Sequence, residues 1–539
     1  MPFPFMIKEY LKLLGRTPEN QIDSSKIITK IALALVSVIL LILGILSLRW
    51  HMVHDSPIML YASFLMNSFD YIPYRDFFDM NMPGIHLFDS VFIRLFGLSN
   101  LGYRIGDLLY LAAIMAATRI WMGSFGKNTA WFGAVVFGIA YLMKGPTMSF
   151  QREFIILLPI SMALCISTIS IKINDILKYT LLGFFFGIAA TIKPHAIIGL
   201  PLVTIFLLLE NHHKTASKSR RLTFFIKNIS YVLLGLLIPF AACLIYLQSN
   251  NALSPFLDIV KNYWPLYNNM TGYYKTIEGL EKTLYLMSSY LNFGDLTLWF
   301  IPCTAAFYIT YYVTGFDAGK KRKILLLAGL AFIYSIYPIF AGKFWPYHWL
   351  IMMYFLILLG SLCLISGNGT KPQSKRLFPI ILFLIILIPA LRPSDNFMHN
   401  IISYSSSEEN IGFMENIMAT EIADYMNKHL QDGDLAQPLD WTGGAIHAML
   451  ISKAKIATPF IYDFHFYHHL SNPYILNLRR EFISHLRKSN PKYIIQIFAN
   501  RPWPYGKDTD SNFDNLIDYI NSSYSPAVER REYIIYVRK

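Results

Sequence analysis

Long runs of apolar residues recur along the chain, and within each run the apolar positions cover every face of a helix instead of one stripe. A transmembrane helix needs roughly 20 such residues in succession. The pattern therefore predicts a mainly α, polytopic membrane protein with about eleven transmembrane helices. The runs begin near Ile31, Ile105, Thr129, Phe154, Tyr179, Ala196, Ile229, Leu296, Ile324, Trp349 and Leu377.

The first run, residues 31–48, is predicted to remain in the protein as an anchor. It follows a basic stretch that ends with Lys26 and Lys30, and Arg49 and Trp50 come directly after it. A cleaved secretory signal has a shorter apolar core and ends in a small-residue cleavage site. This stretch has neither feature.

The distribution of charged residues along the chain indicates how the chain is oriented in the membrane. Only 15% of the 539 residues are charged, and the formal net charge is +13. The basic residues collect in alternate short loops, which the positive-inside rule places in the cytoplasm together with the amino terminus. The charge is thus a topology signal, and no nucleic-acid partner is predicted. The loops carry Arg119 and Lys127, Lys172 and Lys178, Lys214 to Lys227, Lys320 to Lys323, and Lys371 to Arg376.

This alternation holds only if residues 85–97 do not cross the membrane. The segment is short, follows Pro83 and Gly84, and contains Asp89 and Arg94. It is therefore predicted to lie as a helix at the outer interface. The odd number of spans then places the carboxyl terminus outside.

The chain is predicted to have two parts. Residues 1–392 form a transmembrane catalytic domain with large outer loops at 51–104 and 248–295, and residues 393–539 form a small extracytoplasmic α/β domain. The four cysteines all fall within predicted spans, so no disulfide framework is predicted. In the second part, strands are expected at 492–498 and 533–537, and helices at 415–429, 473–488 and 512–521.

Polar residues gather at the predicted outer ends of the spans. Ionisable groups near the hydrocarbon boundary are costly unless they are paired or functional. We therefore expect one shared cavity that is open to both lipid and water. The residues concerned are Asp55, Asp76, Asp79, Arg152, Glu153, Lys193, His195, Lys343, Tyr347 and His348.

These residue types suit group transfer from a lipid-linked phosphate. Arg75, Arg152, Lys193 and His348 supply donors for a phosphate group, which an attached lipid would deliver to this depth. A carboxylate that faces them could take a proton from an incoming hydroxyl or amine while the phosphate leaves.

The chain carries five features in a fixed order: Asp55 in a long first outer loop, YRDFFDMNMPG at 74–84, SFQREF at 149–154, IKPH at 192–195 and FWPYH at 344–348. In this order they resemble the GT-C superfamily of polyprenyl-phosphate-sugar-dependent glycosyltransferases. The nearer likeness is to the bacterial branch with the protein O-mannosyltransferases and the lipid A aminoarabinose transferase. No single motif is specific; the order and the common face carry the likeness.

The resemblance implies a glycosyltransferase that moves a sugar from a polyprenyl-phosphate donor to a lipid, glycan or protein acceptor outside the bacterial cytoplasmic membrane. It implies inversion at the anomeric carbon, with Asp55 as the general base. Members often have a second acidic residue nearby, and Asp76, Asp79 and Glu153 all stay open for that role. Some members use a divalent metal ion and others do not, so no cofactor is certain.

Simpler interpretations stand beside the functional ones. Asp55 could cap the helix that Ser56 and Pro57 begin. The acids at 76 and 79 could pair with Arg75, Arg152 could pair with Glu153, and Lys193 could reach for the interface. The aromatic residues at 344–349 could form an interfacial belt, and those at 258–274 could cover the substrate or form a surface helix. The histidines of HFYHH, residues 465–469, make a weak metal-ligand set.

Two other functions also fit a polytopic protein with cations at the boundary. A transporter or flippase of lipid-linked sugars would often show internal repeats and broken helices at mid-membrane, and the sequence has no evident repeat. A non-catalytic assembly or receptor protein would not need acids and bases from five separate loops on one face. Replacing Asp55 should abolish only glycosyl transfer.

Overall fold

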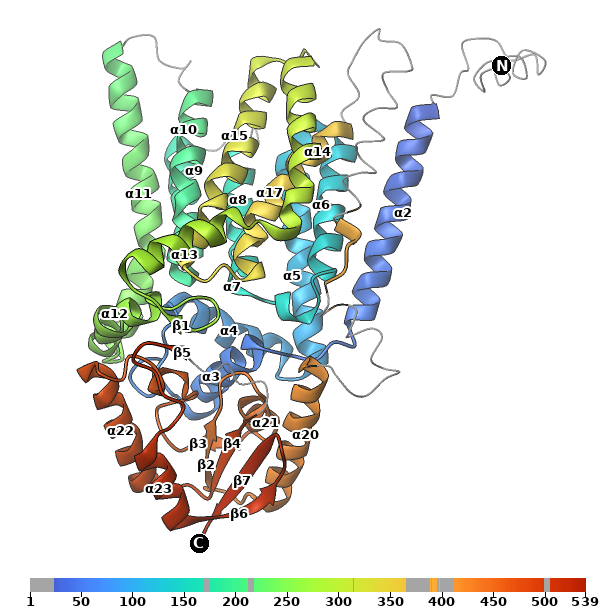
Figure 1. Ribbon diagram of the computed structural model, residues 1–539. Coiled ribbons are helices and arrows are strands. Elements are labelled where there is room, and N and C mark those ends of the chain that lie inside the picture. The colour runs from blue at the N-terminus through green and yellow to red at the C-terminus, as the bar shows by residue number, and fades with distance from the viewer. Residues whose placement is uncertain are drawn as a thin grey trace, which may run out of the picture.

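The computed structural model describes residues 24–168, 174–211, 218–313, 315–364, 388, 390–394, 397, 411–498 and 505–539. Long helices form a bundle in the upper part of Figure 1, and a mixed sheet with its own helices lies below. The bundle helices are α2 (Ser24–Ser47), α5 (Asn100–Trp121), α6 (Lys127–Leu142), α8 (Leu157–Thr168), α9 (Asp175–Ile192), α10 (Leu200–Asn211), α11 (Lys218–Ser249), α14 (Thr297–Tyr308), α15 (Ala318–Ser335) and α17 (Leu350–Ser361).

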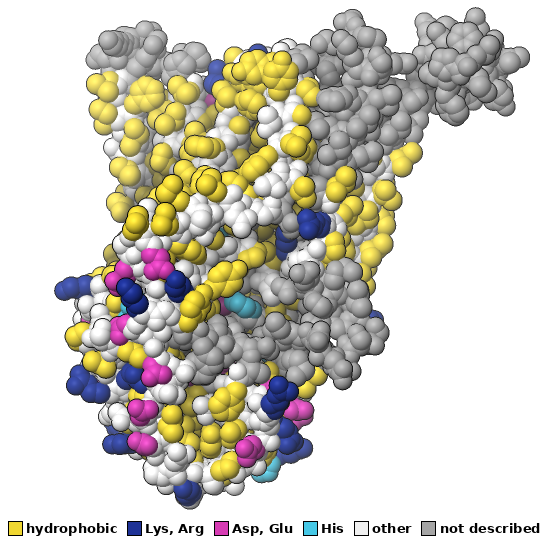
Figure 2. All heavy atoms as spheres, in the orientation of Figure 1, with side chains coloured by type: hydrophobic (Ala, Val, Ile, Leu, Met, Phe, Trp, Pro, Cys, Tyr) yellow, Lys and Arg dark blue, Asp and Glu magenta, His cyan; other side chains and the backbone are white. Residues whose placement is uncertain are grey.

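Seven segments of the described chain are helical, long and apolar enough to cross a membrane. They coincide with expected spans, and three further expected spans coincide with α6, α8 and α14, whose described lengths are 16, 12 and 12 residues. The expected span near Leu377 lies outside the described residues. In Figure 2, hydrophobic side chains cover the bundle and charged side chains gather on the lower part. The protein is a mainly α, multi-pass membrane protein.

Two short helices of the first outer loop lie between the bundle and the sheet. They are α3 (Asp55–Phe69) and α4 (Pro83–Phe96), and neither is among the candidate spans. This agrees with the expectation that residues 85–97 do not cross the membrane. Because α4 begins at Pro83 and ends at Gly97 with φ of 76°, proline and glycine set both of its ends.

The second large outer loop forms α12 (Leu253–Asn268), a short strand β1 (Lys275–Thr276) and α13 (Gly279–Leu291). Strand β1 pairs in parallel with β5 (Tyr505–Gly506), which belongs to the carboxyl-terminal part. The Thr276 hydroxyl also donates to the Lys507 carbonyl oxygen over 2.6 Å. The second loop is thereby joined to the carboxyl-terminal part.

The carboxyl-terminal part contains a five-stranded sheet in the order β3-β2-β4-β7-β6. Strand β2 is parallel to β3 and β4, while β7 is antiparallel to β4 and β6. The strands expected at 492–498 and 533–537 are confirmed, whereas β2, β3 and β6 were not expected. The strands are β2 (Leu435–Leu439), β3 (Lys455–Ile456), β4 (Tyr493–Ile497), β6 (Tyr524–Glu529) and β7 (Tyr533–Arg538).

Helices α20 (Ile411–His429), α22 (Pro473–Ser489) and α23 (Asp514–Ser523) match the expected helices, and α21 (Ala445–Ile451) adds to them. Helix α21 packs on α3. The Tyr61 hydroxyl of α3 donates to the carbonyl oxygen of Ala454 over 2.8 Å, and one hydrophobic core contains residues from both parts. The first outer loop is therefore packed against the carboxyl-terminal part.

Candidate active site

A cavity with about 160 Å³ of free volume lies where the bundle, the first outer loop and the carboxyl-terminal part meet. From the sequence, we expected the polar residues at the outer ends of the spans to share one cavity. The cavity brings together six of the residues expected there, which come from four separate stretches of the chain. These residues are Asp55, Arg152, Lys193, His195, Lys343 and His348.

Asp55 is the first residue of α3, and its carboxylate bonds with two neighbours. One oxygen lies 3.1 Å from Arg152 Nη2 and the other 2.9 Å from His54 Nδ1. The capping interpretation is wrong, because His54 holds the N-cap position and no side chain caps this helix. Burial alone would raise the pKa of the Asp55 carboxyl, but the positive charges of His54, Arg152 and Lys193 outweigh it and hold that pKa well below its usual range.

Arg152 is held from two sides at the start of α7 (Arg152–Ile155). Besides Asp55, its guanidinium contacts the side-chain oxygen of Asn81. Asn81 is in turn fixed by Asp79, whose Oδ1 accepts from the Asn81 backbone and side-chain nitrogens over 2.6 Å and 2.7 Å. Asp79 itself does not line the cavity, so it acts on Arg152 through Asn81. Asn81 lines the cavity and was not singled out from the sequence.

Glu153 is fully buried behind the cavity wall and holds two basic side chains in front of it. Its Oε1 lies 3.5 Å from Lys193 Nζ and 3.6 Å from His348 Nε2, and it accepts from the Tyr337 hydroxyl over 3.0 Å. The adjacent Arg152 and Glu153 thus have different carboxylate and cation partners instead of pairing with each other. Burial lowers the pKa of Lys193, and the Glu153 carboxylate works in the opposite direction.

Lys343 also lines the cavity, but its amine already donates hydrogen bonds to backbone carbonyl oxygens. Its Nζ donates to the carbonyl oxygens of Tyr267 and Met270 over 2.8 Å and 2.6 Å. It also lies 4.2 Å from the centre of the Tyr267 ring. Burial, aided by the charge of Lys282, lowers the pKa of Lys343 well below its usual range. Lys343 therefore fastens the end of α12 to the bundle.

Besides Asp79 and Glu153, three more predicted site residues do not line this cavity. The Arg75 guanidinium is largely exposed and pairs with Asp76 at 2.7 Å, while its Nη1 donates to the Asn250 carbonyl oxygen over 3.2 Å. Tyr347 is buried beside His348, with ring centroids 4.8 Å apart, and does not line the cavity. Arg75 and Asp76 therefore have the structural pairing that the sequence offered as the alternative.

Aromatic side chains form another part of the cavity wall. Helix α12 contributes Trp264 and Tyr267, the loop before η8 (Pro346–Trp349) contributes Trp345, and the carboxyl-terminal part contributes Trp441 and Tyr462. Trp441 is fixed by its indole N–H, which donates to the Tyr274 hydroxyl over 3.1 Å. The sequence pointed to the aromatic stretch 258–274 but carried no signal for Trp441 or Tyr462, which lie far along the chain.

The histidines at 465–469 do not form a metal site with their neighbours. His465, His468 and His469 are buried, and His469 Nε2 lies 2.9 Å from the Leu266 carbonyl oxygen. Across the described residues, no group of three or more His, Cys, Asp or Glu side chains is arranged to hold a metal ion. The described part of the chain therefore offers no candidate ligand set for the divalent metal that the resemblance left open.

Comparisons with known proteins agree on the fold. No protein-family model matches the sequence, and no curated protein matches it in a sequence search. Among solved structures, ArnT from Cupriavidus metallidurans in the apo state is 12% identical, with a TM-score of 0.52 over 93% of this chain and 97% of that chain. The same ArnT bound to undecaprenyl phosphate is also 12% identical, with a TM-score of 0.51 and the same coverage.

A more distant likeness is to the archaeal oligosaccharyltransferase AglB from Archaeoglobus fulgidus, in complex with an inhibitory peptide and a dolichol-phosphate. It is 12% identical, with a TM-score of 0.43 over 86% of this chain and 69% of that chain. The ArnT likeness extends over nearly the whole of both chains, from the bundle to the carboxyl-terminal sheet. The protein therefore has the fold of ArnT.

Proposed function

We propose that the protein is a glycosyltransferase that moves a sugar from a polyprenyl-phosphate donor to an acceptor outside the bacterial cytoplasmic membrane. One observation carries this proposal: a partly buried carboxylate, Asp55, faces Arg152 and Lys193 in a cavity at the end of the membrane bundle. Charge near the hydrocarbon boundary is costly unless it is paired or functional. The ArnT fold with undecaprenyl phosphate bound supports the same class of donor.

The cations are placed to hold the donor phosphate. Arg152 and Lys193 carry fixed positive charge, and His195 and His348 add ring nitrogens to the same wall. Each of the two fixed charges already has a carboxylate partner, Asp55 for Arg152 and Glu153 for Lys193. The cavity can thus balance the single negative charge of a phosphodiester by sharing these cations, without leaving them unpaired before the donor binds.

The reaction would proceed by displacement at the anomeric carbon. The acceptor O–H or N–H gives its proton to Asp55, the freed electron pair forms the new bond to the anomeric carbon, and the bond from that carbon to the phosphate oxygen breaks. The polyprenyl phosphate leaves with this electron pair, stabilised by Arg152 and Lys193. Attack from the face opposite the leaving group inverts the configuration.

Donor binding would also make Asp55 a stronger proton acceptor. While His54 and Arg152 both contact Asp55, its depressed pKa makes this carboxylate a weak proton acceptor. A bound phosphate competes for the same guanidinium and adds negative charge, so the pKa of Asp55 rises toward its usual range. The general base would therefore become effective only when the donor is in place.

The aromatic wall suits the sugar. A sugar ring presents a face of C–H groups that packs on an aromatic face, while its hydroxyls need polar partners such as Asn81 and Asn268. Trp441 and Tyr462 bring the carboxyl-terminal part into this contact. We assign that part to substrate binding as well as to covering the cavity, and we place it outside the membrane with the amino terminus in the cytoplasm.

The deciding experiment uses the full-length protein in lipid with a panel of radiolabelled polyprenyl-phosphate sugars. Asp55→Asn should lower turnover by about 10²–10⁴-fold, the usual contribution of a general base, while donor binding persists. Asp70→Asn is the matched control, because Asp70 is exposed at the other end of the same helix.

Equal turnover by Asp55→Asn and wild type would contradict the assigned base. If no donor is turned over by the wild type but labelled lipid crosses the bilayer of proteoliposomes, the alternative function, a transporter or flippase of lipid-linked sugars, would replace this proposal.

A further inference from the structure

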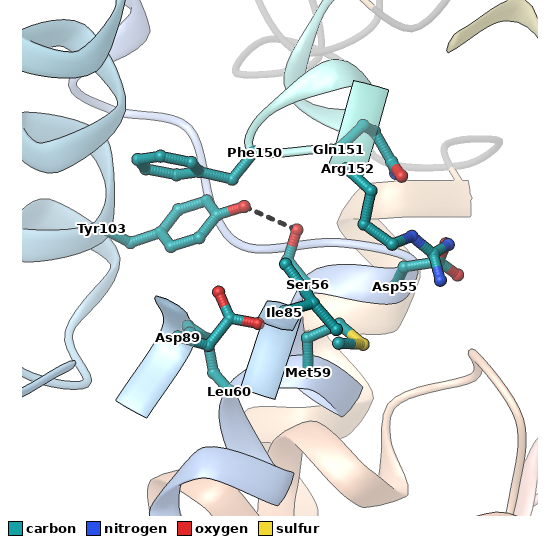
Figure 3. Close-up of a pocket in the computed structure, with 10 residues that line it drawn as sticks. All are labelled: Asp55, Ser56, Met59, Leu60, Ile85, Asp89, Tyr103, Phe150, Gln151 and Arg152. Carbon is teal, nitrogen blue, oxygen red and sulfur yellow. Dashed lines mark hydrogen bonds and ion pairs between the residues drawn. The ribbon is translucent and has the colours of Figure 1, made fainter. Parts of the chain in front are cut away.

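A second, smaller cavity lies directly beside the Asp55–Arg152 pair. Its free volume is about 20 Å³, and both residues of the pair line it as they line the larger cavity. Figure 3 shows the remaining polar side chains around it, which are Ser56, Asp89, Tyr103 and Gln151. The ion pair is thus in contact with the larger cavity on one side and with this small cavity on the other.

Asp89 of α4 is the unexplained group in this space. Its side chain is 5% exposed, and its Oδ2 has no hydrogen-bond partner within the part of the chain that the structure describes. In Figure 3, the carboxyl group points to the side of the cavity where Ser56 and Tyr103 meet. A buried carboxyl without a partner is rare in proteins, so this one calls for a bound group or a function.

The hydrogen bonds around Asp89 leave room for one more donor. The Tyr103 hydroxyl donates its only proton to the Ser149 carbonyl oxygen over 2.8 Å. In the 2.8 Å contact between Ser56 and Tyr103, Ser56 must therefore be the donor. Its own oxygen then keeps a free lone pair that can accept a hydrogen bond from a group in the cavity.

The size of the space matches one water molecule. A site of about 10–15 Å³ or more, measured in this way, can hold a buried water if two to four polar groups surround it. The cavity meets both conditions, since its volume is about 20 Å³ and it offers the Asp89 carboxyl, the Ser56 hydroxyl and the Asp55–Arg152 pair.

We propose that this cavity binds one water that links Asp89 to Asp55 and Arg152, and that Asp89 is a positioning residue which must be neutral for Arg152 to serve the donor phosphate. A neutral Asp89 donates its carboxyl O–H to the water. The positive charge of Arg152 then stays available to Asp55 and to the donor phosphate. An ionised Asp89 places a second negative charge beside Arg152 and weakens donor binding.

The surroundings favour the neutral form in the physiological range. The titratable and charged groups that face Asp89 are Asp55 of α3, Tyr103 of α5 and Arg152 of α7, and no residue of α9, which also packs on α4, lines the cavity. Burial raises the pKa of Asp89 to about 8, and the positive charge of Arg152 opposes this only in part. Asp89 should therefore lose its proton as the pH rises through about 8.

The test compares wild type, Asp89→Asn and the exposed control Asp70→Asn between pH 6.5 and 9. If the ionised form does not bind donor, only about a tenth of the wild-type protein is competent at pH 9, so KM for the donor rises about tenfold from pH 7 while kcat changes little. Asp89→Asn stays neutral and should show a flat KM, and Asp70→Asn should follow the wild type. A rise in KM that Asp89→Asn shares with the wild type would overturn the proposal.

Two readouts separate this inference from the proposed function on which its kinetic test rests. The infrared band of a protonated carboxylic acid should fade in the wild type between pH 7 and 9 and be missing in Asp89→Asn, whatever reaction the protein catalyses. A high-resolution structure should show one water between Asp89 and Ser56. A band that does not titrate, or a cavity without that water, contradicts the inference even if glycosyl transfer is confirmed.

Discussion

At the level of single residues, the candidate site depends on a chain of side chains behind the ones that meet the substrate. Asp79 fixes Asn81, Asn81 contacts Arg152, and Arg152 pairs with Asp55. Glu153 plays the same part for Lys193 and His348 from the other side. The two acids that the sequence placed in the site without a definite role thus hold cations in position from outside the cavity.

This arrangement predicts that Asn81→Ala impairs catalysis although Asn81 need not take part in the reaction. Without the amide oxygen, the Arg152 guanidinium loses one of its two anchors, and a displacement of about 1 Å can cost roughly 100-fold in rate. We therefore expect kcat/KM for the donor to fall by about 10–100-fold. Asn262→Ala is the control, because the Asn262 side chain donates to Asp258 on the surface of α12 and does not line the cavity.

The outcome that would count against this chain of contacts is an Asn81→Ala protein with wild-type kcat/KM. Thermal unfolding is followed in parallel, so that a loss of activity caused by a less stable protein is recognised as such.

At the level of secondary-structure elements, glycines allow helices of the bundle to approach closely. Helices α9 and α11 cross where Gly183 of α9 lies against the backbone of α11, so that a Cβ atom on this glycine would be only 1.9 Å from the Val232 carbonyl oxygen. Gly235 of α11 is in the same situation against Thr180. Small residues at the contact between two helices let the helix backbones approach closely in membranes.

Gly183→Leu should therefore force the two helices apart and destabilise the protein. Overpacking of this kind costs on the order of 1–3 kcal/mol, and thermal unfolding in detergent would show it as a lower transition temperature. Gly123→Ala is the matched control, because a Cβ there would meet nothing within 4 Å. Equal transition temperatures for Gly183→Leu and wild type would mean that this crossing does not limit stability.

At the level of the complete protein, the carboxyl-terminal part closes the site. It packs on α3 through a common core, pairs with the second outer loop through β1 and β5, and adds Trp441 and Tyr462 to the cavity wall. The amino-terminal bundle alone would leave the cavity without this wall. The cavity wall therefore contains residues from both ends of the chain.

Trp441→Ala tests this dependence. Loss of an aromatic contact with the sugar should raise KM for the donor or the acceptor by roughly tenfold, which corresponds to about 1.4 kcal/mol of binding free energy, and Trp441→Phe should restore most of it because the ring face remains. Phe498→Ala, at an exposed position of the same part, should leave KM unchanged. Identical kinetics for Trp441→Ala and wild type would remove the carboxyl-terminal part from substrate binding.

Local features of the sequence were enough to predict the membrane helices and two strands, β4 and β7, of the carboxyl-terminal sheet. Apolar runs and alternating charges are local properties, and the cost of placing polar groups in lipid makes them decisive. The same cost pointed to Asp55, Arg152, Lys193, His195 and His348, which do meet in one cavity.

Which polar residues face that cavity, and which support it, became clear only from the packing of the folded chain. Arg75 and Asp79 stand in the same motif, yet one pairs at the surface and the other reaches the site through Asn81. Trp441 enters the wall from a distant part of the chain, and Asp89 gains its closed surroundings only when α3, α4, α5 and α7 pack together. Such contacts depend on how helices are placed against one another, which neither periodicity nor local charge specifies.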